Sequence, residues 1–279
     1  MLTLLEVLDR TTNYFAAKGV PNARPQAEWI LAHALDCKRL DLFLRFDMPL
    51  QEPVLEKLRP LVKRRALREP LQYILGTAPF HNLTLRCDAR ALIPRPETEE
   101  LVEQIISRHK EAPARVLDLG TGTGAIALAL AKAWPGVDVT AVDASADALA
   151  LAAENATANG LEGRVKFVLS DWFNNVEGRF DLIASNPPYL TRGEWESAEP
   201  EVRACEPYAA LVADNEGLAD LERILRAAPQ RLNAGGCVAL ETGIAHHASL
   251  AKIAAELGYA SHEGLPDMSG RPRFFFASI

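Results

Sequence analysis

From residue 114 onward, short apolar runs alternate with stretches typical of amphipathic helices, and this alternation constrains the fold more than any other feature. Five of these runs are ARVLDLG from Ala114, VDVTAVD from Val137, VKFVLSD from Val165, FDLIASN from Phe180 and CVALETG from Cys237. Such runs are typical of parallel strands whose two faces are both covered by helices. Two last candidate strands, YASHEGL and RPRFFFASI, have no helix between them, which favours an antiparallel pair at the sheet edge. We therefore predict an α/β fold with a seven-stranded sheet whose last strand is antiparallel.

The first part of the chain has a helical pattern instead. LTLLEVLDRTTNYFAAKG spaces its leucines on one helix face. A second helix is expected to place Trp29 and His33 in an apolar stripe, and a third to be interrupted at Pro60. These segments predict a small helical bundle.

The period of the pattern changes near residue 76. FHNLTLRCDARALIPRP alternates between apolar and polar residues, which predicts a β-hairpin or an extended linker. We assign residues 1–75 to an N-terminal helical domain, residues 76–96 to a β-hairpin linker and residues 97–279 to the sheet domain.

The composition places the chain among ordinary globular proteins, with 279 residues, 48% hydrophobic and 24% charged. No apolar run approaches the length of a membrane span, and the amphipathic start carries acids where a signal peptide has bases. We expect a cytoplasmic protein. Its four cysteines are scattered without metal-ligand spacing, so we expect reduced thiols and no metal.

Charge is distributed unevenly along the chain. Residues 1–86 hold 13 Lys and Arg against 9 Asp and Glu, a net charge of +4, whereas residues 87–279 hold 17 against 28, a net charge of −11. An acidic sheet domain is poorly suited to gripping a phosphate backbone. Within the basic part, the run from Lys63 to Arg68 is either a solvated helix face or a docking patch, and we favour the solvated face.

A glycine-rich loop follows the first strand, in DLGTGTGAIALALA. Glycines at this point allow a tight turn and let a ligand approach the backbone at the start of the next helix. Dinucleotide-binding folds use G-x-G-x-x-G here, but this loop has G-x-G-x-G preceded by Asp118, which fits a cofactor without a pyrophosphate. The candidate cofactor-binding residues of the loop are Gly120, Thr121, Gly122, Thr123 and Gly124.

Polar residues also end the next three strands. Asp143, 23 residues after Gly120, can accept hydrogen bonds from both hydroxyls of a ribose. Asp171 can accept from an adenine amino group, and Trp172 either stacks on the base or packs in the core; beside the other residues we favour stacking. Asn186 ends the fourth strand. Because open α/β sheets bind ligands at the carboxyl ends of their strands, these side chains are expected to meet around one ligand.

The fourth strand ends in Asn186-Pro187-Pro188-Tyr189, where two prolines stop the ladder. Together with the glycine loop, this motif resembles the amino-group methylation motif of Rossmann-like class I methyltransferases that use S-adenosyl-L-methionine. An amide nitrogen is a poor nucleophile because its lone pair is delocalised. Hydrogen bonds from its N–H groups to the Asn186 oxygen and the Pro187 carbonyl would orient the nitrogen and return density to the lone pair, while Tyr189 forms a wall.

Further motifs narrow the resemblance. PLQYILGTAPF, LIPRPETEELVE, VLDLGTGTGAIALALA, SNPPY and the EP..AL pattern from Glu206 follow in the order found in the peptide chain release factor glutamine methyltransferases, the PrmC/HemK family. The resemblance implies transfer of a methyl group to the side-chain nitrogen N5 of the glutamine in the Gly-Gly-Gln loop of class 1 release factors. S-adenosyl-L-homocysteine would be the second product, the N-terminal domain would dock the release factor, and we expect a monomer without direct nucleic-acid contact.

By position, the resemblance implies cofactor contacts and a glutamine-binding site. The cofactor set is Gly120 to Gly124, Asp143, Trp172 and Asn186, and the glutamine set is Asn186, Pro187, Pro188 and Tyr189. Arg95 and Glu97 are expected to have supporting roles near the cofactor or hinge, or else to form an interdomain ion pair. The chain departs from the family at Thr242 and His246, and we expect the adjacent His246 and His247 to lie on the surface.

Three other functions fit the sequence less well. A nucleic-acid amino-methyltransferase requires a basic catalytic face and, for duplex DNA, a target-recognition domain. A non-enzymatic nucleotide sensor leaves the Asn-Pro-Pro-Tyr motif unexplained. Reduction linked to NAD is disfavoured by the glycine spacing and by the lack of a convincing histidine for proton relay.

Overall fold

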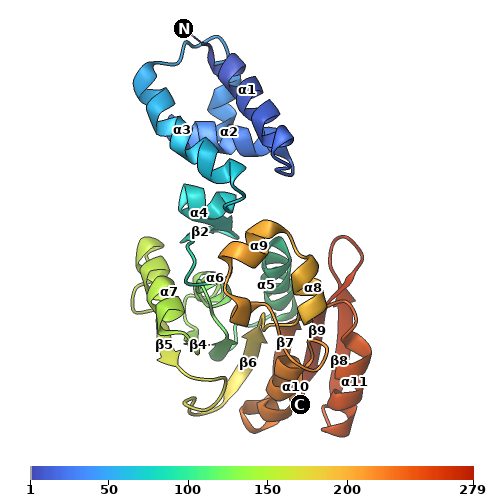
Figure 1. The fold of residues 1–279 in the computed structure, drawn as a ribbon. Coiled ribbons are helices and arrows are strands. Elements are labelled where there is room, and N and C mark those ends of the chain that lie inside the picture. The colour runs from blue at the N-terminus through green and yellow to red at the C-terminus, as the bar shows by residue number, and fades with distance from the viewer. Residues whose placement is uncertain (1) are drawn as a thin grey trace. The chain divides into compact units, whose positions relative to one another are not determined.

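The computed structural model describes residues 2–279, which fall into two compact units (Figure 1). The helical unit consists of the chain up to Gly76 together with Glu199–Cys205. The sheet unit consists of Thr77–Ala198 and Glu206–Ile279. A short segment from the second half of the sequence therefore belongs to the N-terminal unit, which the sequence did not predict.

The helical unit is built from helices that bury their leucines against one another. They are α1 (Leu4–Ala17), α2 (Ala23–Ala34), the 3-10 helix η1 (Arg39–Leu44), α3 (Glu52–Ala66), α4 (Leu71–Leu75) and α9 (Pro200–Cys205). The first helix starts at a capping box, because the Thr3 hydroxyl accepts from the Glu6 N–H while the Glu6 carboxylate accepts from the Thr3 N–H. Leu4, Leu8 and Phe15 of α1 are fully buried.

Three expectations for this unit are wrong, and the first two concern Pro60 and the apolar stripe of α2. Pro60 does not interrupt its helix, since α3 is continuous through it. Trp29 is 42% exposed and His33 is also exposed, because α2 buries the neighbouring stripe that contains Ile30 and Leu31. Both Trp29 and His33 lie just outside the face that packs on α1 and α3.

Two arginines of the basic run from Lys63 to Arg68 do not belong to a solvated face, contrary to the expectation, although Lys63 itself is exposed. The Arg65 side chain is 3% exposed, and its guanidinium donates to the Glu201 carboxylate at 2.6 Å, to the Glu69 carbonyl at 2.9 Å and to the Gln26 side chain. Arg68 binds both oxygens of Glu201 at 2.7 Å and also pairs with Glu199. These arginines hold α9 within the helical unit.

The sheet unit contains the predicted seven-stranded sheet, in the order β5-β4-β3-β6-β7-β9-β8 (Figure 1). The strands are β3 (Arg115–Leu119), β4 (Asp138–Asp143), β5 (Val165–Leu169), β6 (Phe180–Ser185), β7 (Leu232–Glu241), β8 (Ser261–Pro266) and β9 (Pro272–Ser278). Strand β9 runs antiparallel to both of its neighbours, whereas β3 to β7 pair in parallel. The predicted fold class, including the antiparallel last strand and the edge pair, is confirmed.

Alternating side chains of the strands build two cores, one on each face of the sheet. On one face Val116 and Leu182 pack with α5 (Pro96–Arg108) and α6 (Ala125–Ala133). On the other face Leu117 and Ile183 pack with α10 (Ala219–Ala227) and α11 (His247–Glu256). Burial on both faces explains why these strands are apolar almost throughout.

The hairpin formed by β1 (Thr77–Phe80) and β2 (Leu83–Arg86) is part of the sheet unit, because Phe80, Leu83 and Leu85 join its first core. Helix α7 (Ala146–Ala158) holds this hairpin through Asn155, whose side chain accepts from the Arg86 N–H at 2.6 Å. Three further short helices complete the elements of residues 2–279, namely α8 (Arg192–Ser197), η2 (Tyr208–Ala210) and η3 (Ala228–Gln230). Among residues 2–279, none of the helices has the length and apolar character needed to cross a membrane.

We predict that Arg65→Leu lowers the free energy of unfolding by about 3 kcal/mol, because it leaves buried acceptors without their donor. The matched control is Arg64→Leu, on the same helix. The Arg64 side chain is 42% exposed and pairs with a partly exposed Glu69, so its loss should cost less than about 1 kcal/mol. Urea unfolding followed by circular dichroism measures both, and equal costs would contradict the role given to Arg65.

Candidate active site

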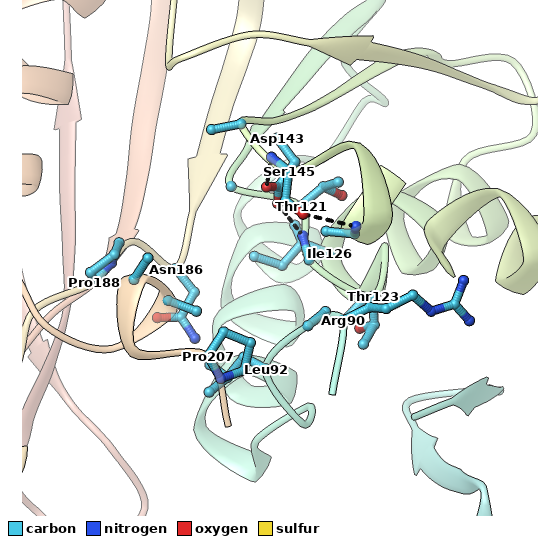
Figure 2. Close-up of a pocket in the computed structure, with 18 of the residues that line it drawn as sticks. Arg90, Leu92, Thr121, Thr123, Ile126, Asp143, Ser145, Asn186, Pro188 and Pro207 are labelled. Atoms are coloured by element: carbon cyan, nitrogen blue, oxygen red, sulfur yellow. Dashed lines mark hydrogen bonds between the residues drawn. The ribbon is translucent and has the colours of Figure 1, made fainter. Parts of the chain in front are cut away.

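A cavity of about 550 Å³ opens at the carboxyl ends of β3 to β6 (Figure 2). It is lined by the glycine loop after β3, by the residues that follow β4, β5 and β6, by the linker before α5 and by the chain around Pro207. Of the residues singled out from the sequence, those that line it are Arg95, Gly120, Thr121, Gly122, Thr123, Asp143, Asp171, Trp172, Asn186 and Pro188. Gly124, Pro187 and Tyr189 are not among the lining residues.

The glycine loop has a backbone that other residues adopt poorly. Gly120, Gly122 and Gly124 have φ values of +70°, +55° and +84°, in the left-handed region. A Cβ atom on Gly124 would also lie 3.1 Å from Leu128 and 3.2 Å from Ala152. The loop leads directly into α6, whose first N–H groups lie beside the cavity, and this arrangement suits an oxygen-rich ligand.

Asp143 fixes the loop to the end of β4. Its carboxylate accepts from the Gly122 N–H at 2.9 Å and from the Ser145 N–H at 2.9 Å (Figure 2). Each oxygen keeps a further lone pair, so the carboxylate can still accept hydrogen bonds from a ligand in the cavity.

The end of β5 brings together residues that the sequence predicted and one that it did not. Trp172 has a φ of +48°, and its indole N–H donates to Asp220 at 3.1 Å. Its ring lies over the glycine loop, since a Cβ on Gly120 would be 3.5 Å from it. Asp171 binds Arg223 through both oxygens, at 2.8 and 2.6 Å, so part of its acceptor capacity is occupied. Asp220 was missed because no strand end or motif marks it.

Two residues that the sequence also missed accept hydrogen bonds from side chains of the Asn-Pro-Pro-Tyr segment. The Asn186 side-chain N–H donates to the Thr98 hydroxyl at 2.9 Å, and the Tyr189 hydroxyl donates to Glu241 at 2.9 Å. Burial raises the pKa of Tyr189, so its hydroxyl stays protonated. Thr98 lies within the RPETE motif, and Glu241 lies at the end of the predicted strand CVALETG. These positions are the sequence signals by which the two residues could have been found.

Two of the motifs quoted from the sequence contact each other at the cavity. The carboxylate of Glu206, from EP..AL, accepts from the Ile93 N–H at 3.1 Å and pairs with Arg95 at 2.6 Å. Its side chain is 2% exposed. Because Glu206 and Arg95 both belong to the sheet unit, the alternative of an interdomain ion pair is wrong for Arg95.

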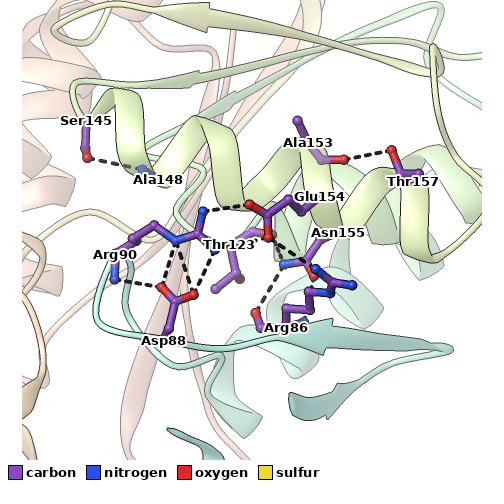
Figure 3. A network of polar contacts seen from close by, with 10 residues as sticks. All are labelled: Arg86, Asp88, Arg90, Thr123, Ser145, Ala148, Ala153, Glu154, Asn155 and Thr157. Carbon is purple, nitrogen blue, oxygen red and sulfur yellow. Dashed lines mark hydrogen bonds and ion pairs between the residues drawn. The ribbon is translucent and has the colours of Figure 1, made fainter. Parts of the chain in front are cut away.

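A polar network fixes the linker that forms another wall (Figure 3). Arg90 lines the cavity and binds Asp88 from its own turn and Glu154 on α7, each at 2.8 Å in the closest pair of atoms. Hydrogen bonds from Arg90 lower the pKa of Asp88. The neighbouring Asn155 donates to the Thr123 carbonyl at 2.9 Å, so α7 holds the linker and the glycine loop together.

His246 is buried, contrary to the expectation of a surface position. It is 7% exposed, its Nδ1 accepts from the Gly243 N–H at 3.1 Å, and its Nε2 lies 3.0 Å from the Glu216 carbonyl. The ring therefore joins the entry of α11 to a neighbouring loop. Within residues 2–279 no group of three or more potential ligand side chains is placed to hold a metal ion.

The comparisons with known proteins match both units. The model of the PrmC N-terminal domain matches residues 6–76, and that of the methyltransferase small domain matches residues 97–199. The chain is 43% identical to the release factor glutamine methyltransferase of Geobacter sulfurreducens, covering 97% of this chain and 95% of that one. It is 39% identical to the protein of the same name from Rhodopirellula baltica, covering 97% and 94%.

Among solved structures, the chain is similar to a T. thermophilus 16S rRNA N2 G1207 methyltransferase in complex with AdoMet and guanosine. The TM-score is 0.52 and the identity 22%, over 72% of this chain and 49% of that one. A likeness at this identity shows the fold of the sheet unit and no more.

Asp118 accepts hydrogen bonds from the glycine loop and from α6, and its burial has a consequence for stability. It is fully buried, and its Oδ2 accepts from the Thr121 hydroxyl at 2.6 Å and from the Ala127 N–H at 3.1 Å. Within residues 2–279 no group donates a hydrogen bond to its Oδ1. Burial raises the pKa of Asp118 from 3.8 to about 7, with the nearby Asp143 adding to the rise.

We predict that the folded chain loses stability as pH rises from about 4 to 7. In this range the folded state keeps a proton on Asp118 that the unfolded state has released, so stability falls by at most about 4 kcal/mol. Asp118→Asn should remove this part of the pH dependence, whereas Asp138→Asn, at a carboxylate that is 62% exposed, should not. Urea unfolding between pH 4 and 8 measures the slopes, and identical slopes for wild type and Asp118→Asn would contradict the assignment.

Proposed function

Because this chain belongs to the release factor glutamine methyltransferase family, we propose that it methylates the side-chain nitrogen N5 of the glutamine in the Gly-Gly-Gln loop of class 1 release factors, with S-adenosyl-L-methionine as the methyl donor. The observation that carries the proposal is that Asn186 lines the same cavity as the glycine loop. A side chain that can orient an amide nitrogen therefore lies next to the residues that would hold the donor.

The cavity residues fit this cofactor. The left-handed glycine loop lets a ligand approach the backbone, and the carboxylate of Asp143 would accept from the ribose hydroxyls. Trp172 would face the adenine ring, with Asp171 or the neighbouring Asp220 accepting from its amino group. When bound, S-adenosyl-L-methionine supplies a methyl group on a positively charged sulfur and leaves as S-adenosyl-L-homocysteine.

The Asn-Pro-Pro-Tyr segment would orient the glutamine. The Asn186 Oδ1 and the Pro187 carbonyl would each accept one N–H of the glutamine amide, which turns its lone pair toward the donor and makes the nitrogen more nucleophilic. The amide proton leaves after the methyl group has been transferred, so no base has to act first. Tyr189 would form a wall beside the glutamine, and its own hydroxyl donates to Glu241.

A second candidate substrate class is RNA, since a solved structure with a similar fold acts on 16S rRNA. The net charge of residues 87–279, with 17 Lys and Arg against 28 Asp and Glu, disfavours contact with a phosphate backbone. We therefore propose the protein substrate. We also propose that the helical unit docks the release factor, and that the enzyme acts as a cytoplasmic monomer without direct nucleic-acid contact.

The test uses purified enzyme with methyl-labelled S-adenosyl-L-methionine. Unmethylated release factor is the acceptor, and a Gln→Ala variant of its loop, ribosomal RNA and duplex DNA are parallel acceptors. We expect label only in the intact release factor, located by mass spectrometry as methylglutamine in the Gly-Gly-Gln peptide. Label in RNA or DNA instead would contradict the proposed substrate while leaving the fold and cofactor in place.

Two variants separate the proposed roles in the cavity. Asn186→Ala should lower turnover about 100-fold or more while largely keeping cofactor affinity, because it removes an interaction that orients the acceptor. Asp143→Ala should mainly weaken cofactor binding, measured by calorimetry. Near-wild-type turnover of Asn186→Ala, or unchanged cofactor affinity of Asp143→Ala, would remove that residue from its role.

A further inference from the structure

Behind the cavity, a chain of hydrogen bonds runs from Asn186 to a buried carboxylate. The Asn186 Nδ2 donates to the Thr98 hydroxyl at 2.9 Å, and the Thr98 hydroxyl donates to the Glu241 Oε2 at 2.6 Å. The other oxygen of Glu241 accepts from the Tyr189 hydroxyl at 2.9 Å. These side chains come from α5, β7 and the segment after β6, and all belong to the sheet unit.

The direction of each hydrogen bond in this chain follows from the charge at its end. While Glu241 is ionised its carboxylate only accepts, and both hydroxyls then turn their single hydrogen toward it. The Thr98 oxygen then has only lone pairs left for Asn186, which must face it with the NH₂ group. As a result the Oδ1 of Asn186 is the atom turned away from Thr98 and available to the cavity.

The surroundings of Glu241 favour a fixed arrangement. Glu241 is 1% exposed and Thr98 is 4% exposed. From β9, Arg273 donates to the Tyr189 hydroxyl at 3.3 Å and to the Thr242 carbonyl at 3.0 Å, so a positive charge lies one side chain away from the carboxylate. From α5, Glu97 adds a negative charge nearby.

We infer that Glu241 is a positioning residue, which through Thr98 holds the Asn186 amide with its oxygen toward the cavity. This inference rests on the proposed function, in which that oxygen accepts from the acceptor amide. The consequence is selectivity for acceptors that present N–H groups. If Glu241 carried a proton on Oε2, it would donate to Thr98, the Thr98 hydrogen would turn to Asn186, and the amide would rotate to present NH₂ to the cavity.

The titration of Glu241 gives this arrangement a pH dependence. Burial raises the pKa of Glu241, while the hydrogen bonds from Thr98 and Tyr189 and the charge of Arg273 oppose the rise. Below that pKa the carboxyl is protonated and the amide loses its orientation. The turnover number should therefore fall as pH is lowered, starting above the ordinary range of a glutamic acid.

The first test compares three substitutions at two buried threonines. Thr98→Val removes the acceptor of the Asn186 N–H, and we expect kcat to fall about tenfold, equivalent to the roughly 1.4 kcal/mol of one hydrogen bond, with little change in cofactor affinity. Thr98→Ser keeps the hydroxyl and should restore kcat to within about threefold of wild type. Thr242→Val is the matched control, since Thr242 is also fully buried beside Glu241 but outside the chain of hydrogen bonds, and it should leave kcat unchanged.

The second test is Glu241→Gln, which keeps the shape of the side chain but presents an NH₂ group to one of the two hydroxyls. We expect kcat to fall at least as far as in Thr98→Val, and the acidic limb of the pH profile to disappear. If Glu241 and Thr98 had a purely structural role, Glu241→Gln and Thr98→Val would both lower thermal stability. The kcat values of Thr98→Val and Thr98→Ser would then not differ. Equal kcat values for the Val and Ser variants would overturn the inference.

A third measurement does not depend on the acceptor. The side-chain NH₂ signal of Asn186 in ¹⁵N-asparagine-labelled protein is assigned by its loss in Asn186→Ala. In wild type it should have the downfield shift of a hydrogen-bonded amide, and it should move upfield in Thr98→Val but not in Thr242→Val. If wild type methylates no release factor, the proposed function fails, and this signal still decides whether Thr98 holds the amide; an unchanged signal in Thr98→Val would refute that.

Discussion

The register of the parallel strands is the constraint on which the site depends. Leu119 at the end of β3 lies opposite Val142 of β4 and Ser185 of β6, so that these strands end at the same level. Asp143 is paired with Leu169 of β5 in the same way. Because each strand ends there, the glycine loop, Asp143 and Asn186 reach one edge of the sheet and line one cavity. A shift of one residue in one strand would turn its side chains to the opposite face.

A second layer of contacts turns this edge into a defined cavity. Glu206 joins the linker before α5 to the segment before η2, and Asn155 of α7 joins the hairpin to the glycine loop. Glu241 lies beneath the Asn-Pro-Pro-Tyr segment as a buried acceptor of two hydroxyl groups. Each of these buried polar groups is satisfied by backbone or side-chain partners within the sheet unit, so the polar site is held rigidly without these groups being exposed.

The sequence predicted what local pattern determines. The sheet, the glycine loop and Asn186 follow from strand length, apolar character and the rule that ligands bind at strand ends. Thr98 and Glu241 could not be found in this way, because their hydrogen bond joins residues 143 positions apart. The basic run from Lys63 to Arg68 was misjudged for the same reason, since Arg65 binds Glu201, 136 positions later.

For Trp29 and His33 the error was different. The apolar stripe predicted for α2 was displaced around the helix by one position, so it included these two exposed residues.

A crystal structure of the chain with S-adenosyl-L-homocysteine and an unmethylated class 1 release factor tests the central claim most directly. We predict the glutamine amide nitrogen within hydrogen-bonding distance of both the Asn186 Oδ1 and the Pro187 carbonyl, facing the sulfur of the cofactor product in the cavity. A glutamine bound elsewhere, or an Asn186 amide that turns its NH₂ group toward the glutamine nitrogen, would contradict the account.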